Sequence, residues 1–74
     1  MEFTLYTLPN CSICHMIKTK LNEKQIKYTE AGLNEIASIL NIDHAPVLKI
    51  SHNEKVDFIT SPGEMVKLIN NYVE

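Results

Sequence analysis

Residues 2–21 read EFTLYTLPNCSICHMIKTKL, and this stretch decides the fold. The segment 2–7 alternates polar and apolar side chains of β-forming types, which predicts a strand. Pro9 and Asn10 then break the pattern. Four apolar residues follow at the spacing of one helix face: Ile13, Met16, Ile17 and Leu21. A helix is therefore predicted over about 12–24 with this stripe buried, and two cysteines stand where the strand turns into the helix.

Three further segments carry strand patterns. Residues rich in β-branched and aromatic side chains predict strands over 26–31, 47–51 and 55–59. The polar residues 52–54 predict a turn that joins the last two strands as a hairpin. Gly32 is expected to end the first of the three.

Two further helices are predicted. Asn34 is expected to cap a short amphipathic helix that ends near Asn41, with Ile36, Ile39 and Leu40 as its apolar residues. Ser61-Pro62-Gly63-Glu64 has the pattern of a capping box, in which Ser61 is the N-cap and Glu64 stands three residues later. The helix that follows is expected to bury Met65, Leu68, Ile69 and Tyr72.

The predicted order is β-α-β-α-β-β-α in one domain that covers residues 1–74. The right-handed crossover makes the first two strands parallel, whereas the late hairpin is antiparallel. We expect an α/β fold with a mixed, four-stranded sheet flanked by three helices.

Composition limits the class of function. The chain has 74 residues, of which 45% are hydrophobic, and a net charge of −2 without a basic cluster. These values predict a globular domain and argue against nucleic-acid binding. The apolar runs are too short for a membrane helix, and the N-terminal stretch lacks the features of an export signal. We expect a cytoplasmic monomer, in which a structural disulfide would be unusual.

The Cys-x-x-Cys spacing suits a redox dithiol. Cys11 is predicted at the start of a helix, where unpaired N–H groups and the helix dipole favour a thiolate. Its pKa is expected to fall from about 8.5 into the range of roughly 3.5 to 7.5. Cys14 lies one turn further and is expected to be less exposed and to keep its proton. Cys11 would then attack a substrate disulfide, and Cys14 would resolve the mixed disulfide.

The two cysteines could also serve other chemistry. Cys-x-x-Cys-His is also the c-type haem attachment spacing, but His15 is predicted to point away from the apolar stripe, toward solvent. A Cys₂His₂ metal site could use both cysteines with two of His15, His44 and His52, in a zinc or iron–sulfur carrier. A redox-inert binding module is a further alternative. A purely structural cross-link of so short a loop stabilises a fold by only about 2 kcal/mol.

Two side chains of the first helix follow the dithiol. His15 lies four residues after Cys11, so a protonated imidazole could lower the pKa of the Cys11 thiol. The alternative is a solvated surface histidine. Lys18 is interpreted as an ordinary surface charge.

The strand, the Cys-Ser-Ile-Cys at a helix start and Ala45-Pro46-Val47-Leu48 opening a later strand together resemble the glutaredoxin/thioredoxin family, as a small glutaredoxin-like redoxin. The resemblance implies a cis Ala45–Pro46 bond that faces the dithiol, and a substrate site shaped by Ala45, Pro46 and Val47. It implies no bound cofactor. It also brings His44 near the dithiol, where this side chain could tune the pKa of a thiol.

Departures from the family pattern bear on the electron donor. Ser12-Ile13 between the cysteines fits neither the glutaredoxin nor the thioredoxin dipeptide, and residues 7–10 carry no cation. Glu64 stands at the helix start where glutaredoxins hold a glutathione carboxylate, so weak glutathione binding is expected. The segment around the dithiol also resembles the redoxins that donate electrons to ribonucleotide reductase. We favour thioredoxin reductase and NADPH over glutathione as the source of electrons for a protein-disulfide substrate.

Overall fold

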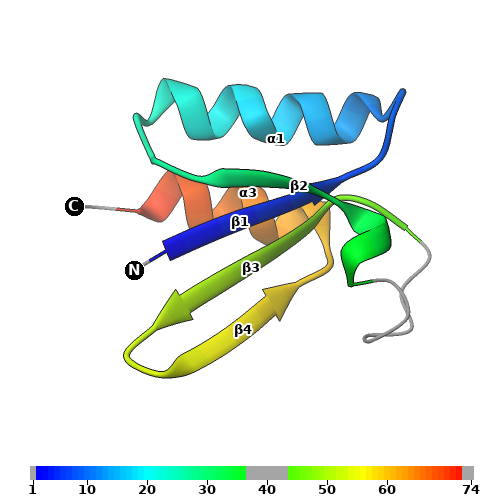
Figure 1. Cartoon of the computed structure of the whole chain (residues 1–74). Helices are drawn as coiled ribbons and strands as arrows, with labels where there is room; N and C mark the ends of the chain where they lie inside the picture. Colours follow the sequence, from blue (N-terminus) through cyan, green and yellow to red (C-terminus); the bar gives the residue numbers. More distant parts are fainter. Residues whose placement is uncertain (1, 37–43, 73–74) are drawn as a thin grey trace.

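The computed structural model describes residues 2–36 and 44–72. Its elements are β1 (Glu2–Thr7), α1 (Ser12–Glu23), β2 (Thr29–Gly32), the 3-10 turn η1 (Leu33–Glu35), β3 (Val47–His52), β4 (Lys55–Ile59) and α3 (Pro62–Asn71), as Figure 1 shows. The order of strands and helices in these ranges agrees with the α/β prediction. α1 and β4 match their predicted bounds to within one residue.

The four strands form one mixed sheet in the order β2-β1-β3-β4. β1 pairs in parallel with β2 and antiparallel with β3, and β3 pairs antiparallel with β4. Asn53 and Glu54, in the turn between β3 and β4, have φ values of 48° and 68°. Two successive positive φ values are typical of the tight turns that match the twist of a hairpin. The predicted parallel crossover and the predicted hairpin are both confirmed.

Each face of the sheet has its own core, because alternate residues of a strand point to opposite faces. α1 and α3 pack together over one face, where the buried residues are Phe3, Leu5, Ile17, Leu21, Ile26, Leu48, Ile50, Met65 and Ile69. On the other face η1 contributes to a smaller core of Tyr6, Leu33, Ile36 and Val47. Leu5 and Tyr6 are thus neighbours in sequence but are buried on opposite sides of β1.

The second strand begins later than predicted. It starts at Thr29, which pairs with Thr4 of β1, rather than at residue 26. Ile26 carries the strand-like pattern, but its side chain is buried in the core beneath α1 and α3, before the chain reaches β1. The apolar residue therefore marks a core contact rather than a strand start.

The helix predicted over about 34–41 is the main difference from the expected fold. The described part of it, η1, is a short 3-10 turn preceded by Gly32, so Asn34 is not its N-cap. The Gly32 N–H donates a hydrogen bond of 3.3 Å to the Glu35 carboxylate. The rest of the predicted helix, 37–43, lies outside the described residues. Within the described ranges there are two α-helices, where the sequence predicts three helices.

α3 begins where the sequence predicts. Ser61 is its N-cap and Pro62 its first residue. The Ser61 side chain makes no capping hydrogen bond, so the prediction of a reciprocal capping box is wrong. Met65 and Ile69 are buried, while Leu68 and Tyr72 pack only partly against the core. Within the residues that the structure describes, neither α1 nor α3 is long and apolar enough to cross a membrane.

Candidate active site

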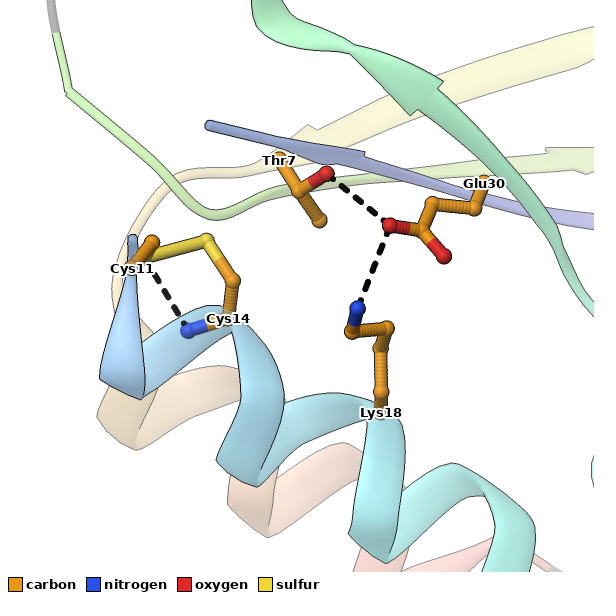
Figure 2. Close-up of a disulfide and its surroundings, with 5 residues drawn as sticks. All are labelled: Thr7, Cys11, Cys14, Lys18 and Glu30. Carbon is orange, nitrogen blue, oxygen red and sulfur yellow. Dashed lines mark hydrogen bonds and ion pairs between the residues drawn. A yellow bond between two sulfur atoms is a disulfide. The ribbon is translucent and has the colours of Figure 1, made fainter. Parts of the chain in front are cut away.

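Cys11 occupies the N-cap position of α1. The preceding turn contains Asn10 with a φ of 60°, a left-handed conformation that asparagine tolerates better than most residues. The Cys11 Sγ accepts a hydrogen bond of 3.1 Å from the Cys14 N–H, drawn as a dashed line in Figure 2. The sulfur therefore takes the place that serine or aspartate oxygens occupy at many helix starts. It faces the unpaired N–H groups and the positive end of the helix dipole.

Cys11 and Cys14 form a disulfide, with their Cα atoms 5.2 Å apart (Figure 2). Their environments differ. Cys14 is only 2% exposed, whereas Cys11 is half-buried at the surface. The sequence predicted this order of exposure from the position of each cysteine on the helix. One sulfur is thus open to attack and the other is screened behind it.

The predicted buried stripe of α1 is wrong in its first half. Ile13 and Met16 are 44% and 40% exposed. The buried residues of this helix are Cys14, Ile17 and Leu21. These three residues share one face of α1, which packs toward the sheet, so the Cys14 side chain is buried. At about 100° per residue, Ile13 and Met16 lie on the flank of α1 away from Lys18.

A cleft of about 800 Å³ opens beside the disulfide. Its walls come from the end of β1, the loop to α1, the first two turns of α1, and β2. Both cysteines line it, together with Thr7, Leu8, Asn10, His15, Lys18 and Glu30. A group bound in this cleft therefore lies next to the dithiol.

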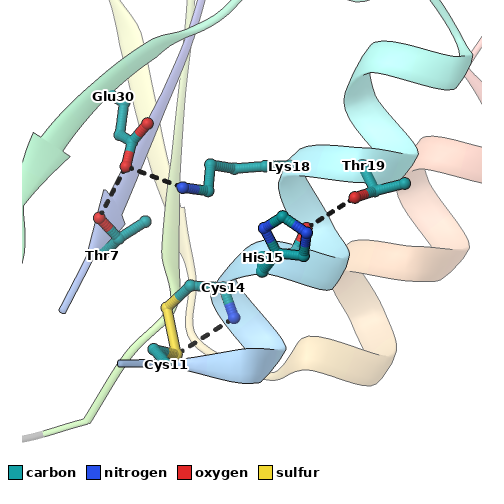
Figure 3. A network of polar contacts seen from close by, with 7 residues as sticks. All are labelled: Thr7, Cys11, Cys14, His15, Lys18, Thr19 and Glu30. Carbon is teal, nitrogen blue, oxygen red and sulfur yellow. Dashed lines mark hydrogen bonds and ion pairs between the residues drawn. A yellow bond between two sulfur atoms is a disulfide. The ribbon is translucent and has the colours of Figure 1, made fainter. Parts of the chain in front are cut away.

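An ion pair joins two walls of the cleft. The Lys18 Nζ on α1 lies 3.2 Å from Oε2 of Glu30 on β2. The same oxygen accepts a hydrogen bond of 3.2 Å from the hydroxyl of Thr7 on β1 (Figure 3). The Lys18 and Glu30 side chains are 29% and 44% exposed, so the pair contributes little to stability. The sequence pattern predicts Lys18 as an ordinary surface charge and contains no local signal that points to Glu30.

The segment that resembles the family's substrate site lies at the same end of the sheet. The Ala45–Pro46 bond is cis, as the resemblance implies. Val47 pairs with Tyr6, one residue before the end of β1, and the chain leaves β1 there toward Cys11. Pro46 and Val47 are fully buried and Ala45 is partly buried. A partner molecule would therefore meet mainly the backbone of this segment.

Of the three histidines, only His15 lines the cleft beside the dithiol. His15 is exposed and lines the cleft, whereas His44 is exposed but is not among the residues that line it. His52 lies at the opposite end of β3, beside Asn53. Over residues 2–36 and 44–72, no three His, Cys, Asp or Glu side chains gather in a way that could hold a metal ion. Of the two predicted tuning residues, the structure brings His15 to the dithiol cleft.

Comparison with solved structures identifies the fold. The chain matches the trimeric glutathione transferase TDR1 of Leishmania with a TM-score of 0.77 and 18% identity, over 93% of this chain but only 17% of that longer one. It matches NrdH-redoxin of Escherichia coli, a glutaredoxin-like protein with a thioredoxin-like activity profile, with a TM-score of 0.68 and 21% identity. That match covers 92% of this chain and 95% of the redoxin.

No family model and no curated protein gives a significant match to the sequence. The structural likenesses show a thioredoxin-like fold, of the small form that the glutaredoxin-like redoxin shares. This is the fold that the Cys-x-x-Cys and Ala45-Pro46 segments predicted by resemblance. The fold and the close cysteine pair fit a thiol–disulfide redox protein.

Proposed function

We propose that this protein is a dithiol–disulfide oxidoreductase that reduces disulfides in other proteins. One observation carries the proposal. The Cys11 sulfur caps a helix and accepts the Cys14 N–H, while the sulfur of Cys14 is bonded to it from a buried position. A helix N-terminus favours a thiolate, and the thiolate is the form that attacks disulfides. A second thiol within bonding distance completes the exchange.

The proposed reaction uses both sulfurs in turn. The Cys11 thiolate attacks one sulfur of the substrate disulfide, and the other substrate sulfur leaves as a thiolate that takes a proton from water. A mixed disulfide now joins Cys11 to the substrate. Cys14 gives its proton to water and attacks the Cys11 sulfur, so the Cys11–Cys14 bond forms and the second substrate sulfur leaves as a thiolate. Two electrons pass from the dithiol to the substrate, and a reductase returns them.

The surface around the dithiol supports a protein substrate. Leu8 is an exposed apolar side chain that lines the cleft, and Ile13 and Met16 are exposed on the other flank of the first turns of α1. Large apolar side chains exposed around a site favour contact with a partner protein over contact with a small polar thiol. We propose that the Ala45–Pro46 backbone pairs with the substrate chain while these side chains cover its apolar residues. The disulfide of ribonucleotide reductase is one substrate of this class.

Charge supports thioredoxin reductase over glutathione as the reductant. Glutathione carries two carboxylates and needs cations to bind. Lys18 is the only lysine among the residues lining the cleft, which include no arginine, and it is already paired with Glu30. Glu64 adds a negative charge in the first turn of α3. These charges oppose the binding of a second anion.

The test is insulin reduction with two electron supplies. Thioredoxin reductase with NADPH is compared with glutathione, glutathione reductase and NADPH, and NADPH consumption is followed by its absorbance. We expect turnover with the first supply and little with the second. Fast turnover with glutathione would reverse the choice of reductant and leave the dithiol chemistry intact.

Two variants serve as controls. Cys11→Ser removes the nucleophile and is expected to abolish turnover. Cys14→Ser keeps the nucleophile and is expected to accumulate the mixed disulfide, which mass spectrometry detects. If the native protein turns over with neither supply, the oxidoreductase proposal is wrong, and a redox-inert binding module or a metal carrier takes its place.

A further inference from the structure

In the resolving step Cys14 must carry a negative charge, and the start of α1 does not stabilise that charge. Cys14 is 2% exposed and lies among the apolar residues of α1. To attack the mixed disulfide Cys14 must become a thiolate. Burial in apolar surroundings disfavours this charged form relative to the neutral thiol. The N–H of Cys14 itself is already directed at the Cys11 sulfur. If the protein works as proposed above, another group must stabilise the second thiolate.

The charged groups around Cys14 come from two elements. On α1, Lys18 follows Cys14 by one turn and His15 is its neighbour in sequence, while β2 supplies Glu30; all three line the same cleft. Residues four apart on a helix are neighbours, and helical side chains lean toward the N-terminus, so Lys18 leans toward Cys14. Thr7 of β1 adds a neutral hydroxyl that holds the Glu30 carboxylate.

We propose that Lys18 is a second functional residue of the dithiol: its ammonium group stabilises the Cys14 thiolate in the resolving step, while Glu30 and Thr7 hold it at the cleft. Figure 3 shows the Lys18 side chain extending from α1 to the Glu30 carboxylate, one turn beyond the disulfide on the side of the helix that faces the cleft. Glu30 has two opposing effects in this arrangement. It fixes the position of the ammonium group, and its negative charge weakens the effect of that group on Cys14.

The two partners therefore have opposite expected effects. Removing the charge of Lys18 leaves the Cys14 thiolate unsupported and slows resolution. Glu30→Gln keeps an oxygen that accepts hydrogen bonds but removes the negative charge, so resolution becomes faster. A carboxylate that took the Cys14 proton would give the opposite sign for Glu30→Gln. Since the pair is partly exposed to water, we expect changes of about threefold to tenfold in rate.

The experiment follows the two thiols separately. Reduced protein is mixed with dithiobis-nitrobenzoate, a symmetric aromatic disulfide that releases one coloured thiolate when Cys11 attacks and a second when Cys14 resolves the mixed disulfide. Stopped-flow absorbance gives both rates. For Lys18→Met we expect the second rate to fall about fivefold while the first changes by less than about twofold. Lys18→Arg should keep the second rate near that of the native protein.

Matched variants separate this effect from a general change in charge. Lys20→Met makes the same charge change on another face of α1, where Lys20 lies near Glu23 and Asn70, and should leave both rates unchanged. Repeating the Lys18 and Glu30 substitutions in a His15→Gln background removes the imidazole that α1 also contributes to the cleft, and the direction of each rate change should persist.

The outcomes are distinct. A second rate that is unchanged in Lys18→Met, or slower in Glu30→Gln, overturns the role of Lys18. Native protein that releases only one coloured thiolate has no resolving step, which overturns the proposed dithiol chemistry and the role of Lys18 together.

Discussion

Replacing Cys14 by alanine leaves Cys11 as the single thiol of a chain that has two cysteines. The substitution keeps the backbone N–H of residue 14, which donates to the Cys11 sulfur at 3.1 Å in the native protein. The pKa of Cys11 in this variant therefore measures what the start of α1 does to a thiolate. We expect it to lie well below that of an ordinary cysteine.

The magnitude follows from two contributions. A hydrogen bond to a charged group stabilises it by about 1.5 to 3 kcal/mol, and a helix N-terminus adds about 0.3 to 1 kcal/mol. Since about 1.4 kcal/mol corresponds to one unit of pKa, the sum of about 2 to 4 kcal/mol lowers the pKa from about 8.5 by roughly 1.5 to 3. Cys11 is half-buried, so water weakens both contributions. We therefore expect the smaller end of this range, with a pKa of about 6 to 7.

The assay is the rate of alkylation by iodoacetamide as a function of pH, supported by thiolate absorbance in the ultraviolet. The same variant unfolded in urea serves as the reference and should titrate near 8.5. A folded protein whose Cys11 also titrates within about half a unit of 8.5 would refute the reasoning, because the N-cap geometry would then have no effect on the thiolate.

The same shift has a consequence for stability. Because the folded pKa of Cys11 is expected below its unfolded value, the thiolate stabilises the fold fully above about pH 8.5. This contribution is lost as the pH falls through the folded pKa. Comparing Cys14→Ala with a variant that also lacks the Cys11 thiol should therefore give a difference in unfolding free energy of about 2 kcal/mol at pH 9 and almost none at pH 5. Urea denaturation at the two pH values measures it.

Three further predictions concern packing, capping and substrate contact. Leu21→Ala removes a fully buried side chain from the core shared by α1 and α3 and should lower the unfolding free energy by about 2 to 5 kcal/mol in urea denaturation, whereas the exposed Asn22→Ala should change it by less than about 0.5 kcal/mol. Ser61→Ala should cost less than about 0.5 kcal/mol instead of the usual cost near 1 kcal/mol, because the Ser61 side chain makes no capping bond; a larger loss would show that it caps α3 in solution. Replacing Ile13 and Met16 together by serine should raise the KM for insulin without changing the reaction with dithiobis-nitrobenzoate, and an unchanged KM would exclude this flank of α1 from substrate binding.

Much of the candidate site could be predicted from local patterns. The alternation over 2–7, the break at Pro9 and Asn10, and the helical spacing that follows all lie within twenty residues. Each pattern is set by neighbours along the chain, so together they place Cys11 at a helix start and Cys14 one turn inside it. The cis Ala45–Pro46 bond was predicted only through the family resemblance, because local sequence by itself strongly favours trans.

Tertiary structure decided which side chains surround the dithiol. From helical spacing alone, Ile13 and Met16 are predicted to be as buried as Ile17. The packing of α1 against the sheet and α3 instead buries Cys14 and leaves Ile13 and Met16 exposed. The ion pair of Lys18 with Glu30 spans 12 positions and the Thr7–Glu30 bond spans 23, so neither leaves a periodic signal in the sequence. The sequence by itself therefore determined the order of the elements and the start of α1, since both depend on contacts between near neighbours. The charges of the cleft that Cys14 also lines come together only when β2 pairs with β1.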